Sequence, residues 1–554
     1  MSVPGSFAVL RVLWLLSVFG TVLPLDGGML FPRESTSREV KELNGLWDFR
    51  PDGSPNRNEG FEKAWHKRRL AEVSGSGDCF KTVTQFSHAL NVSWVNGEKV
   101  TEHEGGHLPF EAEISSLIRR DPTKPCRITI AVNNTLTLET LPPGTIQYMN
   151  DRTRYPDGFF VQNIDFDFFN YAGIHRPVLL YTTPKVYVDD IIVETNFMDN
   201  TGKFISNFLT STKEYLDSSL HLLLSTTGSG ITTTTDINHF APANGCYILE
   251  TKEERDISET STYEDLYTLP VGIRTVNVTK TQFLINNKPF YFHGVNKHED
   301  SDIRGKGLDW PLIVKDFNLI KWLGANSFRT SHYPYAEEIL QMCDRHGIVV
   351  IDELSLNASL YINVNNICFP CRTLIKHTKA LDHTRPVTYI TDSNYARDKG
   401  APFVDVVCVN SYFSWYHDPG HLEVIPIQLN AQFENWYGKY KKPIIQSEYG
   451  ADALPGLHMD PPMMFTEEYQ NALLQSYHDV FDQKRKQYVI GELIWNFADF
   501  MTAQAIHRVV GNKKGIFTRQ RQPKAAAFIL RRRYWRLANE TWRLPPWTKY
   551  PCSL

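Results

Sequence analysis

Acidic, amide and aromatic residues follow a series of short apolar segments in the second half of this 554-residue chain. The set comprises His293, Asn296, His298, Glu299 and Asp300; Arg329, Ser331, His332 and Tyr333; Asp352 and Glu353; Asn410, Ser411 and Tyr412; Glu448 and Tyr449; and Glu492, Trp495, Asn496 and Asp499. If the segments are strands of one parallel sheet, their carboxyl ends meet at the same edge and these side chains form one site.

The residue types narrow the chemistry of such a site. His293, His298 and Glu299 are ligand types, but their spacing matches no H-E-x-x-H pattern, and Cys368-x-x-Cys371 has no second cysteine pair at zinc-site spacing. We therefore expect no metal and no cofactor. A serine nucleophile would need a G-x-S-x-G turn, which the sequence lacks. Carboxylates with amides and aromatic rings are typical of glycoside hydrolysis, in which one carboxylate attacks the anomeric carbon and another protonates the leaving oxygen.

The elements that must position these residues alternate between strand and helix. The sequence predicts strands over residues 289–295, 325–330, 348–351, 386–390, 404–410, 443–447 and 488–495, and helices over 310–322, 335–346 and 467–481. Alternation over a segment of this length favours a (β/α)₈ barrel, with a doubly wound sheet as the alternative. No Gly-x-Gly-x-x-Gly follows any of the strands, which weighs against the alternative.

The first half of the chain is rich in strands and turns. Residues 92–100 form two extended runs joined by Asn96-Gly97, a strong hairpin signal. Further strands are expected over 127–132, 178–183, 189–195, 221–226 and 246–251, the last three in a small sandwich. The predicted fold is thus a multidomain β plus α/β protein. Its expected parts are a signal peptide (1–24), a jelly-roll-like domain (25–184), an immunoglobulin-like β-sandwich (185–276) and the barrel (277–554).

Composition indicates a packed protein with no general affinity for polyanions. Hydrophobic residues make up 42% and charged residues 22%, and the net charge is −4. We therefore expect neither nucleic acid nor membrane as a partner. An apolar run over residues 12–23 predicts a cleaved signal peptide, hence the secretory route. The sequence offers five glycosylation sequons, at Asn91, Asn133, Asn277, Asn357 and Asn539.

Several motifs closely resemble the lysosomal β-glucuronidases of glycoside hydrolase family 2. They are F-H-G-V-N-K-H-E-D, R-T-S-H-Y-P-Y-A-E-E, N-S-Y-F-S-W-Y, P-I-I-Q-S-E-Y-G-A, G-E-L-I-W-N-F-A-D-F and G-N-K-K-G-I-F-T-R, with D-F-F-N-Y-A-G-I-H-R upstream. The resemblance covers most of the chain. It implies a sugar-binding jelly roll, an immunoglobulin-like domain and a catalytic barrel in a homotetramer. It also implies retaining hydrolysis of β-D-glucuronides, including glycosaminoglycan ends and small-molecule glucuronides, in the lysosome.

The resemblance also implies roles for particular residues. Glu448 matches the nucleophile and Tyr412 the tyrosine that hydrogen-bonds it. Asn512 and Lys514 match the pair that recognises the carboxylate of the substrate, with Arg508 nearby. Asp167, His332 and Trp495 match positions that contact the sugar. From the residues alone, Lys514 is equally well interpreted as a surface lysine, and Trp495 almost equally well as a packing residue.

One part of the family pattern is missing. In the family, the acid/base glutamate follows an asparagine at the end of the fourth barrel strand, whereas residues 354–381 here contain no Asp or Glu and no convincing fourth strand. Segments near 75–93 and 212–264 also match poorly. Three interpretations stay open: an active enzyme with a substitute acid such as Glu353 or Glu492, an impaired relative that binds glucuronides or assembles with an active subunit, and a spliced product that does not fold stably.

Overall fold

The structure is a computed structural model that describes residues 29–54, 57–69, 80–83, 90–119, 123, 125–184, 187, 190–198, 201–209, 220–226, 247–256, 262–272, 274–353, 368–391 and 394–540. The predicted signal peptide and Asn357 lie outside this part of the chain. The chain divides into two compact units, Met1–Glu42 with Leu179–Thr275, and Leu43–Val178 with Val276–Leu554. The predicted three-domain boundaries remain a prediction.

The first unit consists of antiparallel β-sheets. Its strands are β1 (Val40–Glu42), β9 (Leu179–Tyr181), β10 (Asp190–Met198), β11 (Thr201–Leu209), β12 (Leu220–Thr226), β13 (Tyr247–Asp256) and β14 (Thr262–Val271), in the sheets β1-β9, β10-β11 and β12-β13-β14. Arg38 Nε and Nη2 donate to the two carboxylate oxygens of Asp265 over 2.9 and 2.5 Å. This buried bidentate pair ties the segment before β1 to β14.

The first part of the second unit is also built of strands. They are β2 (Leu46–Phe49), β3 (Phe80–Val83), β4 (Leu90–Val95), β5 (Glu98–Glu104), β6 (Ile128–Asn133), β7 (Gly144–Tyr148) and β8 (Phe160–Ile164), with the short helices α2 (Glu59–Glu62) and α3 (Ser115–Arg119). The predicted β4–β5 hairpin is confirmed. Asn96 and Gly97 both have positive φ, 53° and 89°, as the two-residue turn requires.

The barrel follows a three-stranded sheet of β15 (Val276–Val278), β16 (Phe283–Ile285) and β17 (Lys288–Phe290). Its strands are β18 (Phe292–Lys297), β19 (Ser327–Thr330), β20 (Val349–Ile351), β21 (Thr388–Thr391), β22 (Val406–Asn410), β23 (Ile444–Glu448) and β24 (Val489–Ile494). All seven were predicted, with ends shifted by a few residues, although the first predicted strand, 289–295, also covers the end of β17. They form one parallel sheet in the order β20-β19-β18-β24-β23-β22-β21.

This strand order distinguishes a barrel from a doubly wound sheet. The first strand, β18, pairs directly with the last, β24, so the sheet closes on that side. The predicted barrel is therefore confirmed, with one correction. In the described residues no strand joins β20 to β21, so both are sheet edges at the place of the missing fourth strand. The improvised strand considered for residues 360–364 lies outside the described part of the chain.

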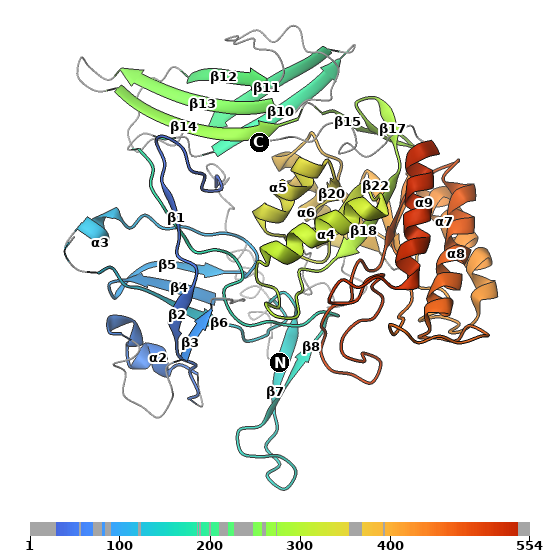
Figure 1. The fold of residues 1–554 in the computed structure, drawn as a ribbon, viewed down its shortest axis with the longest axis horizontal. Helices are drawn as coiled ribbons and strands as arrows, with labels where there is room; N and C mark the ends of the chain where they lie inside the picture. Colours follow the sequence, from blue (N-terminus) through green and yellow to red (C-terminus); the bar gives the residue numbers. More distant parts are fainter. Residues whose placement is uncertain are drawn as a thin grey trace, which may run out of the picture. The chain divides into compact units, whose positions relative to one another are not determined.

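Helices cover the outside of this sheet (Figure 1). They are α4 (Trp310–Leu323), α5 (Glu337–His346), α6 (Cys368–Leu381), α7 (Ile425–Tyr440), α8 (Glu467–Lys484) and α9 (Ala525–Glu540). The predicted helices correspond to α4, α5 and α8. Local sequence fixes their ends: the Asp309 side chain accepts from Leu312 N–H before α4, and Gly324, with φ 78°, ends it.

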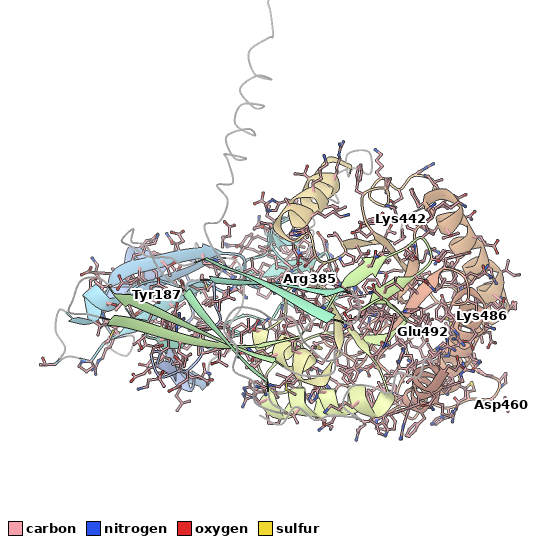
Figure 2. All side chains as sticks on the ribbon, turned by 90° about the horizontal axis from the view of Figure 1, so that it is seen from above. Tyr187, Arg385, Lys442, Asp460, Lys486 and Glu492 are labelled. Atoms are coloured by element: carbon pink, nitrogen blue, oxygen red, sulfur yellow. The ribbon has the colours of Figure 1, made fainter. Side chains whose placement is uncertain are left out.

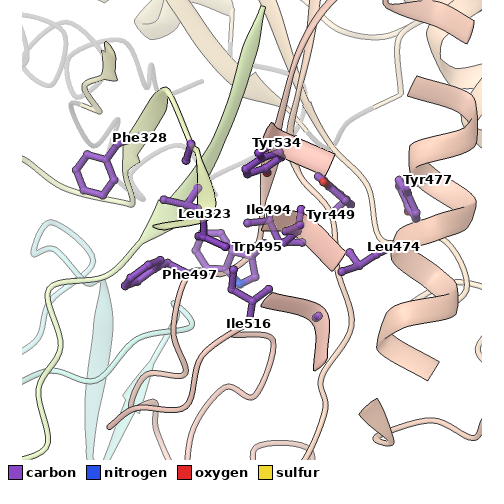
Figure 3. Close-up of a cluster of buried hydrophobic side chains, with 14 of the residues drawn as sticks. Leu323, Phe328, Tyr449, Leu474, Tyr477, Ile494, Trp495, Phe497, Ile516 and Tyr534 are labelled. Atoms are coloured by element: carbon purple, nitrogen blue, oxygen red, sulfur yellow. The ribbon is translucent and has the colours of Figure 1, made fainter. Parts of the chain in front are cut away.

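Two apolar clusters hold the barrel. The inner one lines the barrel interior, with Phe292, Val406, Cys408, Ile445, Ile490 and Leu493. The outer one packs the strands against the helices, and Figure 3 shows part of it, including Leu323, Tyr449, Leu474, Trp495 and Tyr534. The strand-end residues are thereby fixed between two packed layers, which suits a preorganised site.

Candidate functional site

The carboxylate of Glu448, the last residue of β23, is held by two donors. Arg329 Nη1, from β19, donates to Oε1 over 2.7 Å, and the Tyr412 hydroxyl donates to Oε2 over 2.6 Å. Glu448 is only 5% exposed. Both oxygens are therefore satisfied by groups that favour the charged form, and the carboxylate is fixed in direction.

Arg329 is the hub of this cluster. Its Nη1 also donates to Asn296 Oδ1 over 2.7 Å, and its Nη2 lies 2.7 Å from Glu353 Oε2 and 3.2 Å from His332 Nδ1. Because a guanidinium can only donate, His332 Nδ1 accepts this bond. One buried cation thus joins the carboxyl ends of β18, β19, β20 and β23.

Asn296 links the Arg329 cluster to the backbone of the neighbouring strands. Its side-chain amide donates to the carbonyl oxygens of Ser447 and Ile494 over 2.8 and 2.9 Å. These carbonyls lie at the ends of β23 and β24. The amide thus holds β18 and its two neighbours in register beside Glu448.

Charge and burial set the protonation of these groups. Burial and the neighbouring Glu448 carboxylate raise the pKa of Tyr412 well above its usual value, so the hydroxyl stays a donor. Burial acts to raise the pKa of Glu353, but Arg329 and the nearby His332 together outweigh it and hold that pKa below the usual value. Glu353 is therefore held as a carboxylate.

A second polar cluster surrounds Lys514, which is fully buried with 0% exposure. Its Nζ forms an ion pair with Asp452 and a 2.9 Å bond to the Tyr416 hydroxyl, and it lies 5.1 Å from the ring centre of Trp415. The interpretation of Lys514 as a surface lysine is therefore wrong. A buried ammonium framed by rings is placed to bind an anion.

Arg508 and Asn512 extend this cluster towards solvent. Arg508 binds the Asp167 carboxylate with two bonds of 2.8 and 2.7 Å, and Asn512 Nδ2 donates to the same carboxylate over 2.9 Å. Arg508 also donates to the Tyr416 hydroxyl over 2.9 Å. Asp167 is 40% exposed on its side chain, so this edge of the cluster is accessible.

The two clusters adjoin each other. The rings of Tyr412 and Tyr416 meet edge to face with centres 5.1 Å apart, which places the Glu448 donor beside the Lys514 and Arg508 partner. Trp495 stacks on His332 at 4.9 Å while it also belongs to the buried outer cluster. Trp495 is therefore a packing residue of the core that also contacts the site through His332.

The alternative acid Glu492 is wrong as a member of this site. It is fully buried, Arg533 binds it with bonds of 2.6 and 2.7 Å, and Tyr291 donates to it over 2.7 Å. Figure 2 shows Glu492 among the strands, whereas Asp460 and Lys486 lie at the periphery. Glu492 ties β24 to α9 and has no free oxygen to offer a substrate.

Within the described residues, no group of three or more His, Cys, Asp or Glu side chains could hold a metal ion. In the same part of the chain, no helix is long and apolar enough to cross a bilayer. A small, partly open cavity of about 20 Å³ is lined by Lys297, Asp316 and Arg521 among others. It has room for one water molecule and is separate from Glu448, so it is no substrate site.

Sequence reasoning missed the partners that hold the recognised residues. Arg329 was noted only as a polar strand end, and Tyr416 and Asp452 were not considered. Each of the last two lies four residues beyond a recognised residue, Tyr412 and Glu448 respectively. That spacing in the loops after β22 and β23 is the signal that could have found them.

Family comparisons match both parts of the second unit. The pattern described as "Glycosyl hydrolases family 2, sugar binding domain" matches residues 65–184. The pattern described as "Glycosyl hydrolases family 2, TIM barrel domain" matches in two pieces, residues 276–369 and 363–539. The pieces meet in the acid-free interval, as expected if family sequence is missing there.

Individual relatives match over nearly their whole length. The chain is 52% identical to the β-glucuronidase of Felis catus, with 96% of this chain and 95% of that protein covered. For Mus musculus the identity is 53% with 94% of each covered, and for Homo sapiens 51% with 97% and 96% covered. The feline alignment spans 626 positions, more than the 554 residues of this chain, so it must contain gaps on this side.

Solved structures agree. A β-D-glucuronidase from Dictyoglomus thermophilum superimposes with a TM-score of 0.80 at 38% identity, covering 92% of this chain and 99% of that one. A β-glucuronidase from Ruminococcus gnavus in complex with D-glucuronic acid gives a TM-score of 0.77 at 26% identity, covering 91% and 99%.

Proposed function

Because this chain belongs to the β-glucuronidases of glycosyl hydrolase family 2, we propose that it hydrolyses β-D-glucuronides with Glu448 as nucleophile. The candidate substrates are glycosaminoglycan ends, whose leaving group is a sugar alcohol, and small-molecule glucuronides. The observation that carries the proposal is the junction of the two clusters: a fixed carboxylate beside a buried ammonium, linked through Tyr412 and Tyr416.

In the first step, a Glu448 oxygen attacks the anomeric carbon as the bond to the leaving oxygen breaks, giving a covalent glycosyl-enzyme. Arg329 and Tyr412 bind the two Glu448 oxygens and aim the carboxylate. Attack by water on the opposite face of that carbon releases glucuronic acid with its configuration retained.

Lys514, Asn512 and Arg508 provide recognition of the uronic acid. A cation and an amide donor bind a carboxylate well, whereas the neutral hydroxymethyl of a glucoside would leave the ammonium without an anion. Asp167, which occupies Arg508 and Asn512 in this structure, is positioned to accept from sugar hydroxyls. His332 and Trp495 provide the wall of the sugar site.

We also propose that the chain acts in the lysosome as a glycosylated homotetramer reached through the secretory route. The mammalian β-glucuronidases to which the chain is similar support the lysosome, and the apolar run over residues 12–23 supports the secretory route. Asn133, Asn277 and Asn539 are exposed and so accessible to glycosylation. Glycosidase-sensitive mass and sedimentation of the secreted protein test the modification and the assembly.

A second function is favoured by one observation. No Asp or Glu occurs in residues 354–381, so the chain lacks the family's acid/base residue. A chain without acid–base help could bind glucuronides and assemble with an active subunit without turning substrate over. Binding of a glucuronic acid analogue with no turnover of any glucuronide would favour this function over hydrolysis.

The test of the first function compares 4-nitrophenyl β-D-glucuronide with the matching β-D-glucoside. We expect cleavage of the glucuronide only, release of the β-anomer by NMR, and loss of activity in Glu448→Gln. A 2-fluoro glucuronosyl fluoride should label Glu448, as located by peptide mass spectrometry. An adduct on another residue, or activity that survives Glu448→Gln, would refute the assignment.

A further inference from the structure

We propose that this chain selects its substrates by their leaving group: it cleaves glucuronides whose aglycone departs as a weakly basic anion, above all 1-O-acyl glucuronides, and spares alkyl glucuronides. The inference rests on the proposed role of Glu448. It follows from the state of the other acidic groups at this end of the barrel.

Retaining hydrolysis ordinarily needs a second, protonated carboxyl group to protonate the leaving oxygen. Glu353 is the other carboxyl group on the Arg329 hub, 2.7 Å from that guanidinium. The same cation that fixes Glu448 therefore also holds Glu353 ionised, and a carboxylate held in this way has no proton to give.

The remaining carboxylates around this edge are also bound to cations. Within the described residues, the pairs are Asp167 with Arg508, Glu299 with Arg176, Asp300 with Arg519, Asp452 with Lys514, Glu492 with Arg533, and Asp499 with Lys524. Burial raises the pKa of Asp499 to about 6, but this side chain is 2% exposed and its Oδ1 accepts from Lys524 Nζ over 2.8 Å, so it does not face a leaving oxygen.

Asp352 is not among these ion pairs, but its side chain lies on the other face of the sheet from Glu448. It accepts from the Thr330 hydroxyl over 2.9 Å, and its charge acts on the thiol of Cys343 in α5. Its neighbours Ile351 and Glu353 pack towards the barrel interior and towards Arg329 respectively. Alternation along the strand thus puts Asp352 on the helix side of the sheet, away from Glu448.

Two other groups near Glu448 could carry a proton. The Tyr412 hydroxyl is committed to Glu448 at 2.6 Å and is a very weak acid there. His332 Nδ1 accepts from Arg329, so the neutral ring carries its proton on Nε2, and the ring lies against Trp495 and Phe166. The connection from β20 to β21 adds no carboxyl group either, because residues 354–381 contain no Asp or Glu.

The chemistry then sorts substrates by the basicity of the leaving anion. With an acyl glucuronide, the bond from Glu448 Oε to C1 forms while the C1–O bond breaks, and the carboxylate leaves with the bonding electrons and needs no proton. With an alkyl glucuronide an alkoxide would have to leave, and without an acid that step is slower by about 10²–10⁴-fold.

The second half of the cycle also lacks its base. Water that attacks the glucuronosyl-enzyme must lose its proton to solvent, so this step is slow. Azide attacks C1 as an anion, needs no base, and displaces the Glu448 carboxylate to give β-glucuronosyl azide. Azide should therefore speed release of a good leaving group when breakdown of the intermediate limits the rate.

The experiment uses the full chain with 1-O-benzoyl, 4-nitrophenyl, phenyl and methyl β-D-glucuronide. We expect kcat/KM to fall steeply along this series, with methyl glucuronide at least about 10²-fold below 4-nitrophenyl glucuronide. In ¹⁸O-water, benzoate should carry no label, because the C1–O bond breaks. Azide should yield the β-glucuronosyl azide.

Two variants separate the possible failures. Glu448→Gln should abolish cleavage of all four substrates, and if it does not, the proposed function itself fails. If Glu448 is required but methyl and 4-nitrophenyl glucuronide react within tenfold of each other, the leaving-group inference is overturned and the proposed function stands. Labelled benzoate would mean attack at the ester carbonyl and would also overturn the inference.

Glu353→Gln addresses the nearest alternative acid. We expect it to lower the benzoyl and methyl rates by the same factor, since Glu353 shares Arg329 with Glu448, and to leave their ratio unchanged. A selective loss of methyl glucuronide cleavage would identify Glu353 as the acid and refute the inference. No cleavage of any of the four substrates would refute both proposals.

Discussion

Replacement of Lys514 by Met tests whether its buried ammonium recognises the substrate carboxylate. In the present structure the Lys514 charge is balanced by Asp452, and its Nζ also bonds to the Tyr416 hydroxyl over 2.9 Å. A bound uronate would bring a second anion to this ammonium. A charged hydrogen bond of this kind contributes about 1.5–3 kcal/mol.

That energy sets the expected loss of selectivity. The ratio of kcat/KM for 4-nitrophenyl glucuronide over the matching glucoside should fall by about 10- to 150-fold in Lys514→Met, since about 1.4 kcal/mol corresponds to a factor of ten. The aryl leaving group is chosen because it departs without an acid. Because the ratio compares two substrates on the same protein sample, a loss of folded protein does not change it.

Lys514→Met has a second effect that must be separated from the first. It leaves the Asp452 carboxylate buried, with one Lys513 N–H at 2.7 Å as its remaining donor. Breaking a buried ion pair in this way costs about 3–5 kcal/mol of stability. The double variant Asp452→Asn with Lys514→Met removes both charges and should recover most of that stability.

The double variant is therefore the matched control. We expect thermal unfolding close to that of the parent protein, together with the same loss of substrate selectivity as in Lys514→Met. If selectivity returns along with stability, Lys514 acts through the fold and does not bind the carboxylate. If Lys514→Met keeps the parent ratio, recognition by Lys514 is refuted outright.

Three further outcomes are expected. Tyr412→Phe should lower kcat for 4-nitrophenyl glucuronide by about 10- to 150-fold, because Glu448 loses a charged hydrogen bond; an unchanged kcat would contradict this. Arg329→Met should lower the free energy of unfolding by about 3–5 kcal/mol and abolish nearly all activity. The control Arg521→Met, which breaks the buried pair with Asp316, should lower stability alone. Unfolding and active-site titration measure the two effects. Burial lowers the pKa of His293 to about 4, so below pH 6.5 the unfolded chain binds a proton that the native state does not, and by pH 5 the free energy of unfolding falls by about 2 kcal/mol. His293→Phe should reduce this acid-induced drop in melting temperature. An equal drop in the variant would count against the role of His293.

The sequence predicted the barrel strands because their signal is local. Each strand is a short apolar run, buried on both faces, and between runs come helices with clear caps such as Asp309 and Gly324. The polar strand ends were predictable for the same reason. The sequence did not predict that residues 43–178 form one compact unit with the barrel, because that grouping depends on contacts between distant parts of the chain.

The candidate site was predicted in its members and missed in its connections. Glu448 and Lys514 could be recognised from short motifs, but nothing in a motif states that Arg329 bonds to Glu448 and Glu353 at once. That contact brings together β19, β20 and β23, which are far apart in sequence. The burial of Lys514 was missed because a lone lysine in a loop carries no periodic signal.

The strand that the described residues lack between β20 and β21 and the acid that residues 354–381 lack have one explanation. In a parallel barrel the working residues sit at strand carboxyl ends, so loss of one strand removes its catalytic residue and opens the wall at the same place. Glu448 lies on β23, which keeps both neighbours, β22 and β24, while the gap falls between β20 and β21. The proposed nucleophile Glu448 and its donors can therefore stay in place although residues 354–381 contain no acid. On the proposed mechanism, loss of this acid changes which leaving groups the enzyme can expel without changing which sugar it binds.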